Sequence, residues 1–245
     1  MVPVITRGHT SVMANRRDEE SSKGLFCTPP WATRALIEEI IKRFYGDVSG
    51  QTVWEPACGK GHMSVPLAEH FARVFSTDLV DYGFGDGVLD FTFADAEDAP
   101  WPVDWVIFNP PFPLAEAFAR TALTIARVGV AALVRLAWQE GEERYRLIWR
   151  ENTPTYFCPF AERVPIIEGV WDPEAGTATA YAWAVWRIGQ TPEFPPLVHI
   201  SPGQARRRSK LSDLALATPG EAKRRRLARE QKAETGPDLF GGGDG

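Results

Sequence analysis

The sequence predicts an α/β fold with a doubly wound, mostly parallel sheet. From residue 51 onward, short apolar runs alternate with segments of helical periodicity, which is the order that βαβ units produce. The run 128–136 is apolar enough to be a central strand buried on both faces. With 245 residues, of which 44% are hydrophobic, the chain is long enough to build one such domain around a full core.

The first predicted helix covers 33–44, because apolar residues at 36, 37, 40, 41 and 44 lie on one helical face. It follows 26–30, where two prolines favour a rigid, extended backbone. Further helices are predicted at 63–72, 114–127 and 140–150. The strands predicted around them are 52–55, 74–77, 88–91, 103–108, 128–136, 155–160 and 177–188.

The two ends of the chain differ from this alternating region. Residues 1–24 are polar and lack apolar periodicity, so we expect a flexible leader before a domain at 25–189. Residues 190–245 are expected to form a proline-rich linker and a basic, partly disordered tail with a helix at 220–232. Between Ser201 and Lys232, ten Lys and Arg residues stand against three Asp and Glu, although the whole chain has a net charge of −5. That local charge favours a polyanionic partner, and a solvated tail without a partner is the alternative.

Composition argues against several classes of protein. No apolar run approaches the roughly 18 residues that a membrane span needs, and the first residues lack the apolar stretch of a secretion signal. We therefore expect a cytoplasmic protein that does not bind membranes. Three cysteines and four histidines show no metal-ligand spacing, so reduced thiols and no metal are expected.

Two features at predicted strand ends indicate a nucleotide site. Glu55–Gly61 follows the first strand, and its small residues would let the backbone approach a ligand beyond the carboxyl end of the sheet. Many strand-to-helix turns need glycine only to bend, so this segment alone is weak evidence. Asp78 ends the second strand, where a carboxylate can accept both hydroxyls of a ribose. A capping aspartate is the alternative, but the combined spacing favours the nucleotide site.

Asn109-Pro110-Pro111-Phe112 follows the fourth predicted strand. The prolines remove two backbone donors and lock the turn, which leaves a carbonyl directed outward. That carbonyl and the Asn109 side-chain oxygen can accept both hydrogens of an amino group, which draws the nitrogen lone pair out of conjugation and makes it nucleophilic. Phe112 offers a flat face on which an extruded base can stack. A simple Asn-Pro turn is the alternative, but it is less favoured at the same sheet edge as the other two motifs.

In order and spacing, these motifs resemble the N6-adenine DNA methyltransferases of the gamma arrangement over residues 26–188. The resemblance implies a Rossmann-like class I methyltransferase fold, with a seven-stranded sheet and helices on both faces. It also implies S-adenosylmethionine as cofactor and direct methyl transfer to a base extruded from DNA. Sequence-specific members carry a large target-recognition region, whereas few residues follow 188 here. The chain is therefore similar to a compact phage or prophage enzyme of relaxed specificity.

The resemblance also implies roles for individual residues. The cofactor-binding set is Phe26, Thr28, Pro29, Glu55, Ala57, Cys58, Gly59, Gly61, Asp78, Leu79, Asp90 and Phe91. Within this set Glu55–Gly61 corresponds to the methionine-binding loop, Asp78 to the ribose acceptor, and Asp90-Phe91 to the pair that receives the adenine. The catalytic set is Asn109, Pro110, Pro111 and Phe112. Phe157 and Phe160 fall where the family often places an aromatic against the base, although both could equally be core residues.

DNA is the expected partner of what we expect to be a monomer. Eight basic tail residues could neutralise phosphates without reading bases: Arg206, Arg207, Arg208, Lys210, Lys223, Arg224, Arg225 and Arg226. The segment Pro237-Asp238-Leu239-Phe240 resembles the end of a sliding-clamp-binding peptide. Two alternatives remain open: the same fold acting on RNA adenine or guanine or on a protein glutamine, and an inactive nucleic-acid-binding module. N4 of cytosine is less favoured, because those enzymes more often have Ser in place of Asn109.

Overall fold

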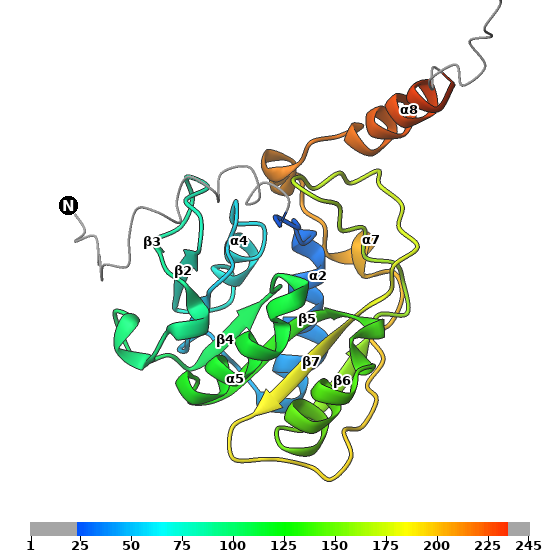
Figure 1. The fold of residues 1–245 in the computed structure, drawn as a ribbon. Helices are drawn as coiled ribbons and strands as arrows, with labels where there is room; N and C mark the ends of the chain where they lie inside the picture. The colour runs from blue at the N-terminus through cyan, green and yellow to red at the C-terminus, as the bar shows by residue number, and fades with distance from the viewer. Residues whose placement is uncertain (1–23, 235–245) are drawn as a thin grey trace, which may run out of the picture.

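The computed structural model describes residues 24–234, so the predicted leader up to residue 23 and the clamp-like segment 237–240 lie outside the described residues. Within them a seven-stranded sheet has the order β3-β2-β1-β4-β5-β7-β6 (Figure 1). Neighbouring strands pair in parallel, except that β7 runs antiparallel to both β5 and β6. The expected fold, a mostly parallel seven-stranded sheet with flanking helices, is confirmed.

The strands are β1 (Thr52–Glu55), β2 (Arg73–Asp78), β3 (Gly87–Val88), β4 (Trp105–Phe108), β5 (Gly129–Arg135), β6 (Tyr156–Pro159) and β7 (Tyr181–Arg187). The α-helices are α2 (Pro30–Leu36), α3 (Lys42–Tyr45), α4 (Ser64–Leu67), α5 (Ala115–Ile125), α6 (Glu142–Arg144), α7 (Gln204–Arg208) and α8 (Glu221–Glu234). Two π-helical segments are η1 (Ile37–Ile41) and η6 (Tyr145–Arg150). Short 3-10 turns are η2 (Phe91–Phe93), η3 (Ala96–Asp98), η4 (Phe112–Leu114), η5 (Leu136–Gln139) and η7 (Leu211–Leu216).

The sheet separates two apolar cores. Along β1, Val53 belongs to the core on one face and Trp54 to the core on the other, and Trp105 and Val106 alternate in the same way on β4. Helix α2 and η1 cover the first face, and α5 covers the second (Figure 1). A sheet covered on both faces needs this two-sided apolar pattern.

Several predicted elements are shorter in the structure. The helix expected at 63–72 is limited to α4, and hydrogen-bonded turns continue from it to Phe71. Strand β3 ends at Val88, because Asp90 accepts a hydrogen bond from the Thr92 amide (3.1 Å) and begins η2. Strand β7 begins at Tyr181, where its pairing with β5 starts.

Residues 204–216 are docked on the domain by a buried ionic cluster. Arg34, which is 3% exposed, donates to both carboxylate oxygens of Asp213 (2.7 and 2.8 Å) and to both of Glu69 (2.8 Å each). A buried guanidinium needs such partners to offset its lost hydration. This part of the predicted tail is therefore an integral element of the fold.

Membrane-spanning helices and clusters of metal-binding side chains are both absent from the described residues. Within residues 24–234, no helix is long and apolar enough to cross a membrane. Over the same residues, no group of three or more His, Cys, Asp or Glu side chains could hold a metal ion.

Candidate active site

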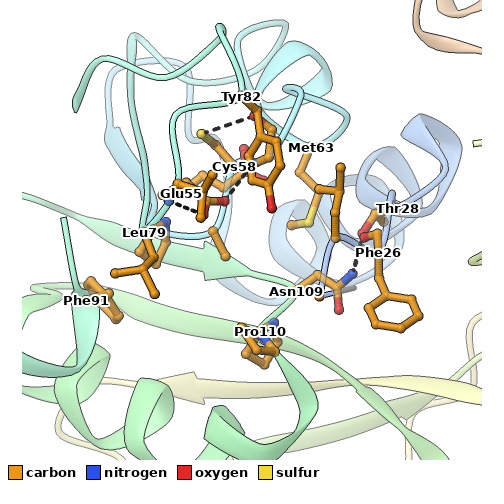
Figure 2. A pocket seen from close by; sticks show the side chains of 18 of the residues that line it. Phe26, Thr28, Glu55, Cys58, Met63, Leu79, Tyr82, Phe91, Asn109 and Pro110 are labelled. Carbon is orange, nitrogen blue, oxygen red and sulfur yellow. Dashed lines mark hydrogen bonds between the residues drawn. The ribbon is translucent and has the colours of Figure 1, made fainter. Parts of the chain in front are cut away.

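A pocket of about 250 Å³ opens where β1, β2 and β4 end (Figure 2). Its lining includes most of the residues that the sequence singled out, namely Phe26, Thr28, Glu55, Ala57, Cys58, Gly59, Asp78, Leu79, Asp90, Phe91, Asn109, Pro110 and Pro111. The carboxyl ends of parallel strands meet at one edge of a sheet, which explains why motifs far apart in the chain converge here. Pro29, Gly61 and Phe112 do not line this pocket.

The loop after β1 can adopt its path only with glycine at two positions. Gly59 and Gly61 have φ values of +51° and +83°, in the left-handed region. A Cβ on Gly59 would lie 2.5 Å from a methyl carbon of Leu25, and one on Gly61 would lie 2.3 Å from a ring carbon of Phe84. Gly61 therefore packs against Phe84 outside the pocket, whereas the backbone at Gly59 lines the pocket.

Asp78 connects this loop to the end of β2. Its carboxylate accepts hydrogen bonds from the amides of Gly59 (2.8 Å) and Val80 (3.2 Å). Partial burial raises the pKa of Asp78 above its ordinary value, against the opposing effect of these hydrogen bonds. The carboxylate is thus fixed at the strand end, where a ribose would meet it.

Glu55 lies deeper in the same pocket and is 1% exposed. The Ser64 hydroxyl donates to its carboxylate, and Ser64 also bonds to the Ser76 hydroxyl (2.7 Å). Burial, together with the nearby Asp78 carboxylate, raises the pKa of Glu55 to about 8 despite the hydrogen bond from Ser64. Without a cation beside it, Glu55 is therefore largely protonated at neutral pH.

The Asn109 amide is held in one orientation at the pocket edge. Its Nδ2 donates to the Phe26 carbonyl (2.9 Å) and to the Thr28 hydroxyl (3.0 Å). Because a carbonyl can only accept, the amide nitrogen must face Phe26 and the oxygen must face away (Figure 2). Asn109 is 9% exposed, and its Oδ1 has no hydrogen-bond partner among the residues that the structure describes.

Phe91 forms an aromatic wall of the pocket and is 1% exposed. Its ring packs edge-on against Trp54 and at a tilt against Phe118, with ring centroids 5.1 Å apart in both pairs. Asp90 directs Oδ1 at the amide and hydroxyl of Thr92 (3.1 and 2.7 Å). The pair predicted for an adenine ring is therefore a rigid aromatic side chain with a carboxylate beside it.

Phe112 faces a second, smaller pocket of about 170 Å³, and Pro110 lines both pockets. The guanidinium carbon of Arg135 lies 3.6 Å from the centroid of the Phe112 ring. The Phe26 ring lies 4.9 Å from Phe112, tilted by 49°. Arg135 therefore covers one face of the Phe112 ring, the side chain that the sequence offers for stacking with an extruded base.

Four other residues that the sequence singled out lie in the apolar cores or at a helix end. Phe157 and Phe160 are buried in the two cores, at 1% and 8% exposed, and line neither pocket. Pro29 is the N-cap of α2. Cys158 is a buried free thiol in the first core, and burial raises its pKa to about 12.

Several pocket residues were not predicted: Leu25, Cys27, His62, Met63, Val80, Tyr82, Leu89, Leu114 and Phe118. Most of them are next to a predicted motif, so a wider window around each motif would have included them. Phe118 is different, since it reaches the pocket from the second turn of α5. Only the packing of α5 on the sheet reveals it.

The predicted DNA-contacting residues differ in exposure and in how far the protein itself engages them. Arg208 and Arg225 are half-buried, and the other six are exposed. Several of the eight pair with carboxylates of the same chain: Arg208 with Glu39 (2.7 Å), Lys210 with Glu69 (2.8 Å), Arg224 and Arg225 with Glu221 (2.6 Å each), and Arg226 with Glu230 (3.7 Å). Arg225 also donates to the Glu168 carbonyl (2.8 Å). Helix α8 projects from the domain on the side where the first described residues lie (Figure 1).

No family model and no curated protein sequence matches this chain. A candidate RNA methyltransferase from Pyrococcus horikoshii is similar in structure, with a TM-score of 0.51 and 18% identity over 69% of this chain and 89% of that one. A type I restriction-modification methyltransferase subunit from Streptococcus thermophilus gives 0.48 and 12% over 76% and 50% of the two chains. Magnesium protoporphyrin IX methyltransferase from Synechocystis PCC 6803, solved with bound S-adenosylmethionine, gives 0.44 and 16% over 73% and 86%.

At such low identities the likeness bears on the fold, and of these three structures only the archaeal one exceeds a TM-score of 0.5. Its similarity covers most of both chains. The chain therefore has the Rossmann-like fold of the methyltransferases.

Proposed function

We propose that this chain transfers a methyl group from S-adenosylmethionine to N6 of adenine in DNA. The observation that carries the proposal is the anchored Asn109 amide, whose oxygen is buried at the edge of the pocket and has no hydrogen-bond partner within residues 24–234. An unpaired buried acceptor costs about 1–3 kcal/mol. An amino group offers the hydrogens that would satisfy it.

The larger pocket suits the proposed cofactor in the charge and chemistry of its lining residues. Three carboxylates line it, from Glu55, Asp78 and Asp90, and Lys60 is the only Lys or Arg among its described lining residues. When bound, S-adenosylmethionine would supply an electrophilic methyl group on a positively charged sulfonium. The carboxylates favour its cationic centres, and Lys60 and the glycine loop can meet its carboxylate. Asp78 would hold the ribose, and Phe91 would bound the adenine.

Asn109 would orient the acceptor nitrogen without removing its proton. Its Oδ1 would accept one hydrogen of the amino group, and the Pro110 carbonyl would accept the other. The nitrogen lone pair then leaves conjugation with the ring and becomes available for in-line attack. Positioning and exclusion of water supply the acceleration. A thiol nucleophile is not needed, and burial raises the pKa of Cys27 to about 11, so this thiol stays protonated at neutral pH.

The exposed basic residues of α7 and α8 support a nucleic-acid substrate over a protein amide. Arg206 and Arg207 lie on α7, and Lys223, Arg224 and Arg226 lie on α8. Cations on exposed helices suit phosphates, which bind without reading the bases. They have no evident use in recognising a glutamine side chain.

RNA is the second candidate substrate, favoured by the fold similarity to the candidate RNA methyltransferase from Pyrococcus horikoshii. The two candidates are separated by supplying labelled S-adenosylmethionine with unmethylated DNA, ribosomal RNA and protein in parallel, followed by nucleoside analysis. We expect N6-methyladenine in DNA alone. Label in RNA alone would support the second candidate. Label only in protein, or none in any substrate, would contradict both.

A further inference from the structure

We propose that Arg225 on the basic helix α8 is a positioning residue for the Asn109 amide. The sequence suggests a phosphate contact for Arg225, but its guanidinium donates one hydrogen bond to Glu221 on the same helix and another to the Glu168 carbonyl in the domain. The kinetic part of the inference rests on the proposed function. The contacts themselves do not depend on the substrate.

Helix α8 is first fixed on the loop that precedes β7. Asp172 is fully buried, and its carboxylate accepts hydrogen bonds from the amides of Gly220 (3.2 Å) and Ala222 (2.9 Å), where the helix begins. The Thr218 amide donates to the Trp171 carbonyl (2.7 Å) just before it. These bonds determine where the first turn of α8 lies.

The Arg225 guanidinium then bridges the helix and this loop. Its Nε donates to Glu221 (2.6 Å), and its Nη1 donates to the Glu168 carbonyl (2.8 Å). A Cβ built on Gly169 would lie 3.8 Å from Nη2, so the guanidinium lies against the turn. A planar fork of donors can make both bonds at once, whereas the single ammonium of lysine cannot reproduce that geometry.

The turn at 168–169 pairs directly with the segment that holds Asn109. Glu168 and Phe26 form an antiparallel bridge, and the Gly169 amide donates to the Leu25 carbonyl (2.6 Å). The Phe26 carbonyl in turn accepts the Asn109 Nδ2 (2.9 Å). Three consecutive contacts therefore connect Arg225 to the catalytic amide, through Glu168 and Phe26.

The consequence is that the position of α8 and the orientation of Asn109 are linked. Loss of the bond to Glu168 would free the turn, loosen the segment around Phe26 and let the Asn109 amide rotate. A residue that only contacts phosphate would instead act on DNA affinity and its salt dependence. Arg229, which is exposed on the same helix, provides a control for charge on α8.

The test uses the full chain with Arg225→Lys, Arg225→Ala and Arg229→Ala. Four quantities are measured: kcat on DNA, KM for DNA, the salt dependence of DNA binding, and hydrogen exchange in peptides that span 24–30 and 166–172. Arg225→Lys keeps the charge and loses the fork. We expect its kcat to fall about tenfold, the scale of one lost hydrogen bond, with an unchanged salt dependence. The Gly169 amide should exchange faster in Arg225→Lys than in the wild type. Arg225→Ala should likewise show a lower kcat and faster exchange at Gly169.

Arg229→Ala should keep the wild-type kcat and exchange rates. The proposal is overturned if Arg225→Lys retains wild-type kcat, with or without a change in exchange. It is also overturned if Arg229→Ala lowers kcat as much as Arg225→Ala does, because a general effect of helix charge would then explain both. If the wild-type chain methylates no nucleic acid, the proposed function fails. The exchange rates at Gly169 still decide whether Arg225 holds the turn.

Discussion

The Thr28 hydroxyl provides a direct test of how the active site is held together. It accepts a hydrogen bond from Asn109 Nδ2 at 3.0 Å, and both groups are buried. Thr28→Val keeps the shape of the side chain and removes the acceptor. One amide hydrogen of Asn109 is then buried without a partner, which costs about 1–3 kcal/mol. If the lost hydrogen bond destabilises the amide orientation that catalysis needs by this amount, kcat/KM should decrease roughly 5- to 150-fold.

Thr28→Ser is the matched control, because it keeps the hydroxyl and should stay close to the wild type. The assay is steady-state methyl transfer together with calorimetric titration of S-adenosylmethionine. Since valine fills the same volume at the pocket wall, cofactor affinity should change far less than kcat/KM. Equal activities of the Val and Ser variants would show that the Thr28 hydroxyl does not orient Asn109 for catalysis. So would a loss of cofactor affinity that accounts for the whole effect of Thr28→Val.

Three further predictions address other parts of the site. Burial raises the pKa of Glu55 from 4.5 to about 8, so the ligand-free protein should lose stability as pH rises from about 4.5 through about 8. Glu55→Gln should abolish this loss in urea unfolding, and an unchanged pH dependence would contradict the assignment. Arg135→Ala should remove a cation–π contact of about 0.5–2 kcal/mol and so uncover the Phe112 ring. An extruded base could then stack there more readily, which should increase the fluorescence of 2-aminopurine placed at the target position. A weaker signal would mean that Arg135 helps to hold the base. Lys223→Ala and Arg226→Ala should each reduce the salt slope of DNA binding by about 1, whereas an unchanged slope would exclude a phosphate contact.

The sequence was sufficient to predict the sheet and the edge at which the site lies. Strand β1 is found at its predicted residues, and Glu55, Asp78 and Asn109 meet because each follows a parallel strand. Alternation of apolar runs and helical faces is a local signal, so it can be detected without knowing the fold. Helix α8 begins one residue and ends two residues after its predicted range of 220–232.

The features that could not be predicted from the sequence depend on contacts between distant segments. The bond between Arg34 and Asp213, the pairing of Phe26 with Glu168, and the cover of Arg135 over Phe112 have no local periodicity. A basic run in the sequence also does not reveal which of its members bind carboxylates of the same chain. Arg208 and Arg225 were for this reason predicted as phosphate contacts, although both are engaged within the protein.

In the proposed function, Asn109 acts on the substrate amino group and not on the cofactor. This division of roles is measured by the transfer of labelled methyl to unmethylated DNA by Asn109→Ala, with the affinity of the same variant for S-adenosylmethionine determined alongside. We expect N6-methyladenine with the wild type and none with Asn109→Ala, whose cofactor affinity should stay nearly intact, whereas Asp78→Ala should weaken cofactor binding. An Asn109→Ala variant that still methylates DNA at the wild-type rate, or that no longer binds the cofactor, would contradict this division of roles.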